Sequence, residues 1–247
     1  MFVAASTRCF SDKPFAEACY LLEELEYDKV EIWFDEAGDH LKPSEVVKDI
    51  DSFYSRFRDS TRLAPTSFCI ESDLDIQSFR VLAKLAKQFR LAQITVPSAR
   101  QGTPFNAEID RLRELSTLGS QEGILISIRT QTGTLTEDPQ TAIELCQAVP
   151  GMGLTLDPSY YICGPQRGRG YDQVFPHVFH IELRDTSPTE VQVPVGLGEL
   201  DYSRLVTQLE RVRYNRALCV ELLPELMDVE TRPIEMRKMR LLLESLL

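Results

Sequence analysis

The sequence lacks several features that mark particular classes of protein. No apolar stretch approaches the roughly 20 residues that a membrane-spanning helix needs. The N-terminus, M-F-V-A-A-S-T-R, has no basic start followed by a long apolar run, so it does not resemble a signal peptide. No Gly-x-Ser-x-Gly motif of a serine hydrolase is present. We therefore expect a cytoplasmic protein that has no membrane partner.

Positive charge is scarce relative to negative charge. The chain has 27 Lys and Arg against 38 Asp and Glu, a formal net charge of −11. Proteins that bind the phosphate backbone need clustered Lys and Arg, so the balance predicts no nucleic-acid partner. The acidity itself indicates solubility rather than a fold.

The cysteines lack the spacing of a metal or redox motif. Six are scattered among apolar neighbours, and no Cys-x-x-Cys pair occurs: Cys9, Cys19, Cys69, Cys146, Cys163 and Cys219. This excludes a zinc ribbon and a thioredoxin-type motif. Buried free thiols in a reducing compartment are the expected state.

Short apolar runs alternate with longer amphipathic runs along the whole chain. Strands are expected at 2–6, 29–35, 63–70, 91–96, 124–130, 153–158, 178–185 and 217–223, although Pro65 weakens the third. Helices are expected at 14–26, 43–58, 76–90, 104–118, 139–148, 202–212 and 233–246. This rhythm predicts a single (β/α)₈ TIM barrel over residues 1–247. The rival, a doubly wound open sheet, would carry a Gly-rich turn where S-T-R-C-F stands.

Several expected strands combine an apolar face with a polar one. In F-H-I-E-L-R-D (179–185) every second residue is apolar, and the others are His180, Glu182 and Arg184. In a barrel the apolar face meets the helices, so the polar side chains point inward. The same alternation on other strands sends inward Glu31, Gln93, Arg129, Asp157, Cys219 and Glu221. Inward polar groups near the end of a strand lie at the C-terminal mouth, where this fold carries its sites.

The inward set contains four carboxylates, and Arg129 opposes them. Glu31, Asp157, Glu182 and Glu221 cannot all stay ionised and unpaired in a partly dry pocket. They need a bound cation, a captured proton or the guanidinium. Two interpretations stay open at this point: Arg129 pairs with two carboxylates in a purely structural network, or the cluster is a functional site.

Four stretches resemble a known family, the xylose-isomerase-like TIM barrels, which include sugar-phosphate isomerases, epimerases and endonuclease IV. The stretches are G-L-T-L-D-P-S-Y-Y (153–161), F-H-I-E-L-R-D-T (179–186), V-G-L-G-E-L-D-Y (195–202) and A-L-C-V-E (217–221). The resemblance implies a divalent cation, Mn²⁺, Mg²⁺ or Zn²⁺, held by Glu, Asp, His and Glu from the last four strands. It also implies proton transfer between adjacent carbons of a sugar.

The chain departs from the family pattern at several ligand positions. Asp157 and Glu221 match, whereas Arg129 stands in place of the first glutamate, Tyr160 in place of a histidine and Glu182 in place of another. The resemblance leaves Asp157, Glu182 and Glu221 as candidate metal ligands. Arg129 disfavours the ion because a fixed positive charge beside a divalent cation costs binding energy.

Roles in a modified mechanism follow from the same resemblance. Glu221 would abstract a proton, Arg129 would stabilise the enediolate oxygen, and Glu182 or Tyr160 would return the proton. Trp33 would cover a sugar ring or pack in the core. The predicted substrate-binding residues are Glu31, Trp33, Gln93, His180 and Arg184.

Three functions remain as hypotheses. The first is a sugar or polyol isomerase or epimerase with an altered or absent metal site, acting on a sugar or sugar phosphate. The second is a non-catalytic sugar-binding or regulatory barrel that has lost its ion. The third, an endonuclease IV-type phosphodiesterase, is least favoured, because that branch needs more than the three histidines present. The sequence leaves the oligomeric state open.

Overall fold

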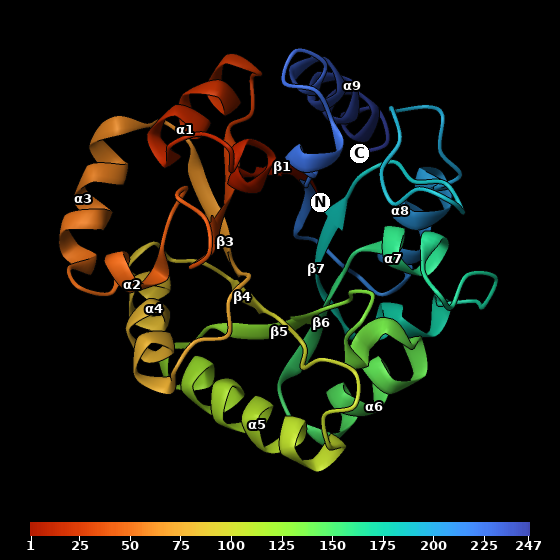
Figure 1. The fold of residues 1–247 in the computed structure, drawn as a ribbon, viewed down its shortest axis with the longest axis horizontal. Coiled ribbons are helices and arrows are strands. Elements are labelled where there is room, and N and C mark those ends of the chain that lie inside the picture. Colours follow the sequence, from red (N-terminus) through yellow and green to blue (C-terminus); the bar gives the residue numbers. More distant parts are fainter.

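A computed structural model describes residues 1–247 as a closed barrel of eight parallel strands in chain order, with β1 paired to β8 (Figure 1). The strands are β1 Phe2–Ser6, β2 Lys29–Phe34, β3 Ala64–Ile70, β4 Gln93–Val96, β5 Leu125–Arg129, β6 Met152–Leu156, β7 Val178–Leu183 and β8 Ala217–Val220. The helices lie around the outside of this ring. The predicted (β/α)₈ TIM barrel is confirmed. No helix is both long enough and apolar enough to span a membrane.

The α-helices follow the predicted order with two differences. They are α1 Phe15–Glu24, α2 Pro43–Val46, α3 Ile50–Ser60, α4 Ile76–Gln88, α5 Phe105–Glu122, α6 Pro139–Ala148, α7 Pro158–Cys163, α8 Tyr202–Arg211 and α9 Arg232–Glu244. The helix expected at 43–58 is divided in two, because Asp49 caps α3 by accepting a hydrogen bond from the Ser52 amide. The short helix α7 was not predicted. Four 3₁₀ segments complete the chain: η1 Thr7–Phe10, η2 Leu135–Glu137, η3 Asp172–His177 and η4 Pro224–Leu226.

Pro65 lies inside β3 without breaking it. It stands opposite Val30 of β2, and the register between the two strands shifts between Val30 and Glu31. Proline lacks the amide hydrogen that a regular ladder uses, so an irregularity beside it is expected. The shift lies immediately before Glu31, one of the predicted inward carboxylates.

The interior of the barrel is polar, and the apolar core lies between the strands and the helices. Ile126, Ile128, Ile181 and Leu183 belong to this outer core, as the alternation predicted. Inside the barrel a set of side chains bond to one another. Ser127 Oγ donates to Gln93 Oε1 at 2.8 Å and lies 2.7 Å from Thr155 Oγ1, and Thr95 Oγ1 lies 2.8 Å from Thr155 Oγ1. The predicted orientation of these strands is therefore confirmed.

Candidate functional site

Arg129, at the end of β5, lies among the carboxylates that the sequence predicted to converge. Its Nε is 2.9 Å from Glu182 Oε2, and its Nη2 is 3.3 Å from Glu221 Oε1. Its Nη1 pairs with Glu71, which directly follows β3. The Arg129 side chain is only 3 % exposed. The guanidinium therefore joins residues that follow or end three strands other than its own.

Arg184 is a second bridging guanidinium, and it is fully buried. Its Nη1 lies 2.5 Å from Asp157 Oδ2, and its Nη2 lies 2.8 Å from Glu221 Oε2. Nε donates to the backbone oxygen of Glu221 at 3.0 Å, and Nη1 donates to Ser159 Oγ at 2.9 Å. These contacts hold the guanidinium against two carboxylates, a hydroxyl and a backbone oxygen of the protein.

A third guanidinium, that of Arg8 in η1, completes the arrangement. Its Nη1 donates to Glu221 Oε1 at 2.8 Å and lies 3.5 Å from Glu71 Oε2. The guanidinium carbon is 5.4 Å from the centre of the Trp33 ring, and Trp33 Nε1 donates to Glu71 at 3.3 Å. We call the set of Arg8, Arg129, Arg184, Glu71, Asp157, Glu182 and Glu221 the arginine cluster.

The two central glutamates have opposite pKa shifts. Burial favours the neutral form of both. For Glu182, burial exceeds the attraction of Arg129, and nearby Glu221 and Glu31 add to it, so the pKa of Glu182 is well above its usual value. For Glu221, Arg129, Arg8 and Arg184 together outweigh burial and lower its pKa. The ionised carboxylate of the pair is therefore Glu221.

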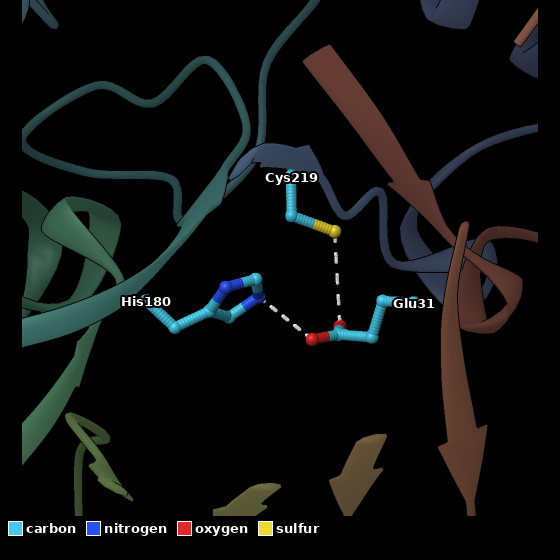
Figure 2. A group of neighbouring side chains, drawn as sticks. All are labelled: Glu31, His180 and Cys219. Atoms are coloured by element: carbon cyan, nitrogen blue, oxygen red, sulfur yellow. Dashed lines mark hydrogen bonds and ion pairs between the residues drawn. The ribbon is translucent and has the colours of Figure 1, made fainter. Parts of the chain in front are cut away.

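A second group lies deeper in the barrel. Glu31 of β2, His180 of β7 and Cys219 of β8 converge on one another, as Figure 2 shows. His180 Nε2 is 2.7 Å from Glu31 Oε2, and Cys219 Sγ is 3.8 Å from Glu31 Oε1. His180 is 1 % exposed, and the other two are fully buried.

The remaining predicted residues lie apart from one another. Gln93 belongs to the hydrogen-bonded interior with Ser127 and Thr95. Trp33 is almost buried at 6 % exposure. The Tyr160 ring lies over Arg184, with 5.5 Å between the guanidinium carbon and the ring centre. Trp33 and Tyr160 thus contact members of the arginine cluster, whereas Gln93 bonds elsewhere in the interior.

Two hollows flank the arginine cluster. One, of about 530 Å³, lies beyond β3 and β4 and is lined by polar groups that include Glu71, Asp73, Ser98, Arg100 and Arg111. We call it the polar hollow. The other, of about 490 Å³, is lined by Tyr160, Cys163, Pro165, Arg167 and Val191. Both reach residues that follow the C-terminal ends of strands, where barrels of this type carry their sites.

The sequence profile of the xylose isomerase-like TIM barrel family matches residues 19–238. The chain belongs to this family. The match spans most of the chain and includes every strand from β2 to β8. The resemblance carried by the four sequence stretches is therefore confirmed.

Solved structures of family-like barrels superpose over nearly the whole chain. The probable 3-DHS dehydratase AsbF from Bacillus anthracis has a TM-score of 0.75 at 16% identity, covering 98% of both chains. A xylose isomerase-like TIM barrel protein from Mycobacterium smegmatis in complex with magnesium has 0.74 at 18%, covering 99% and 97%. The 3-keto-D-glucoside 4-epimerase from E. coli has 0.73 at 14%, covering 98% and 99%. No curated protein sequence matches the chain.

The three carboxylates that the resemblance names as candidate metal ligands are paired with guanidinium groups. Oxygen atoms of Asp157, Glu182 and Glu221 do lie within 4.8 Å of one another, as metal ligands would. Each of these carboxylates, however, already pairs with Arg129 or Arg184. A divalent ion would have to displace hydrogen-bonded guanidinium groups and then remain beside their charge, which opposes binding.

The sequence did not predict two members of the arginine cluster. Arg8 lies in η1 just after β1, and Glu71 is the first residue after β3. Both lie just beyond the strands expected at 2–6 and 63–70, which is why they were not assigned to an inward face. Their position was still a usable signal, because residues that directly follow a barrel strand lie at the C-terminal mouth.

Proposed function

We propose that this family member binds a small sugar, polyol or sugar phosphate at the barrel mouth without a divalent ion and without two-base proton transfer. The observation that carries this proposal is the pairing of Asp157, Glu182 and Glu221 with the guanidinium groups of Arg129 and Arg184. The positive charge that the family draws from a metal is here part of the chain.

Glu221 is poorly suited to remove a proton from a sugar carbon. Its Oε1 lies within 3.3 Å of Arg8 and Arg129, and its Oε2 lies 2.8 Å from Arg184. Three guanidinium groups lower the pKa of this carboxylate despite its burial, and a weakly basic group is an inefficient general base at neutral pH. Its side chain is also fully buried.

The polar hollow is the best place for the ligand. Glu71 lines it and, with a quarter of its side chain exposed, is the most accessible carboxylate of the arginine cluster. Ser98 Oγ, buried and without a hydrogen-bond partner, is available to a ligand hydroxyl. Arg111, 28 % exposed, supplies a donor for a hydroxyl or a phosphate. Convergent donors and acceptors of this kind suit a polyhydroxy compound.

A metal-free isomerase or epimerase is the second candidate, and the two glutamates favour it. Glu182, with its raised pKa, can hold a proton, whereas Glu221 stays ionised. Environments that separate two carboxyl pKa values in this way are typical of acid–base pairs. Both side chains are shielded from solvent, so this function requires the ligand to open the arginine cluster.

The single tryptophan provides a direct test. Trp33 Nε1 bonds Glu71, so a ligand in the polar hollow should change the Trp33 fluorescence. We expect a saturable change on titration with aldoses, ketoses, polyols and their phosphates, and no effect of added Mg²⁺ or Mn²⁺ on the affinity. Glu71→Gln should weaken binding by about tenfold, which corresponds to about 1.4 kcal/mol. Glu17→Gln, on exposed α1 surface, is the matched control.

Two results would reject the proposal. One is the absence of any saturable change with every ligand class, confirmed by calorimetry. The other is binding that appears only after Mg²⁺ or Mn²⁺ is added. Incubation of the bound sugars in D₂O separates the two candidates: deuterium incorporated at carbon and lost in Glu182→Gln identifies the isomerase, and no incorporation supports the binding protein.

A further inference from the structure

The group formed by Glu31, His180 and Cys219 has a donor set that the arginine cluster lacks. It combines a carboxylate, an imidazole and a thiol, and the three side chains come from β2, β7 and β8 (Figure 2). On their strands, His180 and Cys219 stand two residues before Glu182 and Glu221, roughly 7 Å deeper along each strand. No arginine bonds or pairs with any of the three.

The imidazole of this group has an unsatisfied nitrogen. His180 Nε2 lies 2.7 Å from Glu31 Oε2, at ion-pair distance, but it has no hydrogen-bond partner. The side chain is only 2 % exposed, so the nitrogen lies away from bulk solvent. A buried nitrogen without a partner costs free energy unless something else binds it.

The spacing of the donor atoms suits a tetrahedral transition ion. Nε2 of His180, Sγ of Cys219 and a carboxylate oxygen of Glu31 lie within 4.8 Å of one another. Zinc bound to such atoms would separate them by about 3.3–3.6 Å, as its usual bond lengths dictate. The separation of His180 Nε2 from Glu31 Oε2, 2.7 Å, is shorter than this range and that of Cys219 Sγ from Glu31 Oε1, 3.8 Å, is longer, so an ion requires the imidazole and the carboxylate to move slightly apart. Ser67 Oγ, 3.0 Å from Glu31 Oε2, places a further oxygen beside the group.

We propose that Glu31, His180 and Cys219 form a binding site for Zn²⁺ or a similar soft divalent ion, separate from the family's carboxylate site. The thiol and imidazole select Zn²⁺ over Mg²⁺, which prefers oxygen ligands. On binding, the Cys219 thiol proton passes to solvent and His180 donates the Nε2 lone pair to the ion. The Glu31 carboxylate and the Cys219 thiolate together then balance the charge of the ion.

Cobalt is the probe for this site because its spectrum reports thiolate ligation. The full-length protein, freed of metal, is titrated with Co²⁺ and separately with Zn²⁺. We expect binding of one ion per chain and a thiolate-to-cobalt charge-transfer band, and added Zn²⁺ should abolish the band. Zinc-edge X-ray absorption of the unmodified protein should show one sulfur ligand together with nitrogen and oxygen ligands, and this measurement needs no variant.

Matched substitutions locate the ion. Cys219→Ser should remove the band and weaken Zn²⁺ binding by at least about 100-fold, since even outer-shell changes cost 10–100-fold. Cys146→Ser, a buried thiol on α6 outside the barrel, should bind as the unmodified protein does. The inference is overturned if the unmodified protein binds no ion, if absorption shows no sulfur ligand, or if Cys219→Ser retains the band. Binding that is lost in Asp157→Asn but kept in Cys219→Ser would instead place the ion in the carboxylate site and would also reject the proposed function.

Discussion

The arginine cluster and the Glu31–His180–Cys219 group both draw on β7 and β8 but balance buried negative charge differently. The arginine cluster uses guanidinium groups, whose charge is permanent and whose donors satisfy two carboxylates at once. The deeper group has only groups that can lose or gain a proton. The comparison shows that one barrel interior can hold carboxylates paired with guanidinium groups at one depth and a mixed carboxylate, imidazole and thiol set at another.

Removal of Arg184 should cause the largest loss in the free energy of unfolding. In Arg184→Met, Asp157 and Glu221 lose a fully buried partner, so we expect a loss of about 3–5 kcal/mol in the free energy of unfolding. Denaturant titration measures the change. Arg56→Met, at an exposed position of α3, should change the free energy by less than about 0.5 kcal/mol. A loss below about 1 kcal/mol in Arg184→Met would show that the pairing is not what stabilises the mouth.

The two central glutamates should respond unequally to the same substitution. Glu221→Gln leaves three guanidinium groups short of a negative partner, and we expect a loss of about 3–5 kcal/mol. Glu182→Gln imitates a carboxyl group that burial already keeps neutral, so a loss of less than about 1 kcal/mol is expected. Equal losses in the two variants would contradict the assignment of the ionised carboxylate to Glu221.

The same pair predicts a pH dependence. Glu221 and Glu71 have pKa values below their usual value in the folded protein, because the arginines outweigh burial. Their contribution to stability is therefore complete above pH 4.5 and is lost as the pH falls through the folded-state pKa values. Unfolding measured between pH 7 and pH 2 should show this loss, and Glu221→Gln should reduce its slope. An unchanged slope in that variant would remove Glu221 from the acid response.

Tyr160 should have the smallest effect. Its ring lies over Arg184, and its hydroxyl makes no hydrogen bond within the protein, so Tyr160→Phe keeps the contact and should change the free energy of unfolding by less than about 0.5 kcal/mol. Tyr161→Phe is the matched control, because the Tyr161 hydroxyl donates to the Thr136 backbone oxygen at 3.1 Å and should contribute about 1 kcal/mol. A larger loss in Tyr160→Phe than in Tyr161→Phe would show an unrecognised role for the Tyr160 hydroxyl.

The sequence predicted the barrel well because its signals are periodic. The alternation at 179–185 placed His180, Glu182 and Arg184 on the inner face, and all three are buried there. It also predicted that Arg129 would meet the carboxylates. The division of the helix expected at 43–58 depended on one cap at Asp49, and α7 is too short to produce a periodic pattern.

The partners of each charged group were less predictable than the direction in which it points. Alternation identifies the inner face but not which side chains meet across the barrel, since that depends on strand register. The register shift beside Pro65 lies in the pairing of the strand that carries Glu31, and no local sequence pattern predicts it. Arg8 and Glu71 lie just beyond the expected strand ends, so the third guanidinium and its carboxylate emerged only from the structure. The roles predicted for individual residues in substrate binding stay predictions.

The covalent origin of the charge on Arg129 and Arg184 has a consequence for how the mouth is assembled. A metal centre must be loaded after synthesis, competes for whichever ions are at hand and is emptied by a chelator. Here the positive charges belong to arginine side chains of the protein itself. Every molecule therefore carries them once β5 and β7 have paired with their neighbouring strands. The positive charge of these guanidinium groups is therefore in place as soon as the chain has folded, and a chelator cannot remove it.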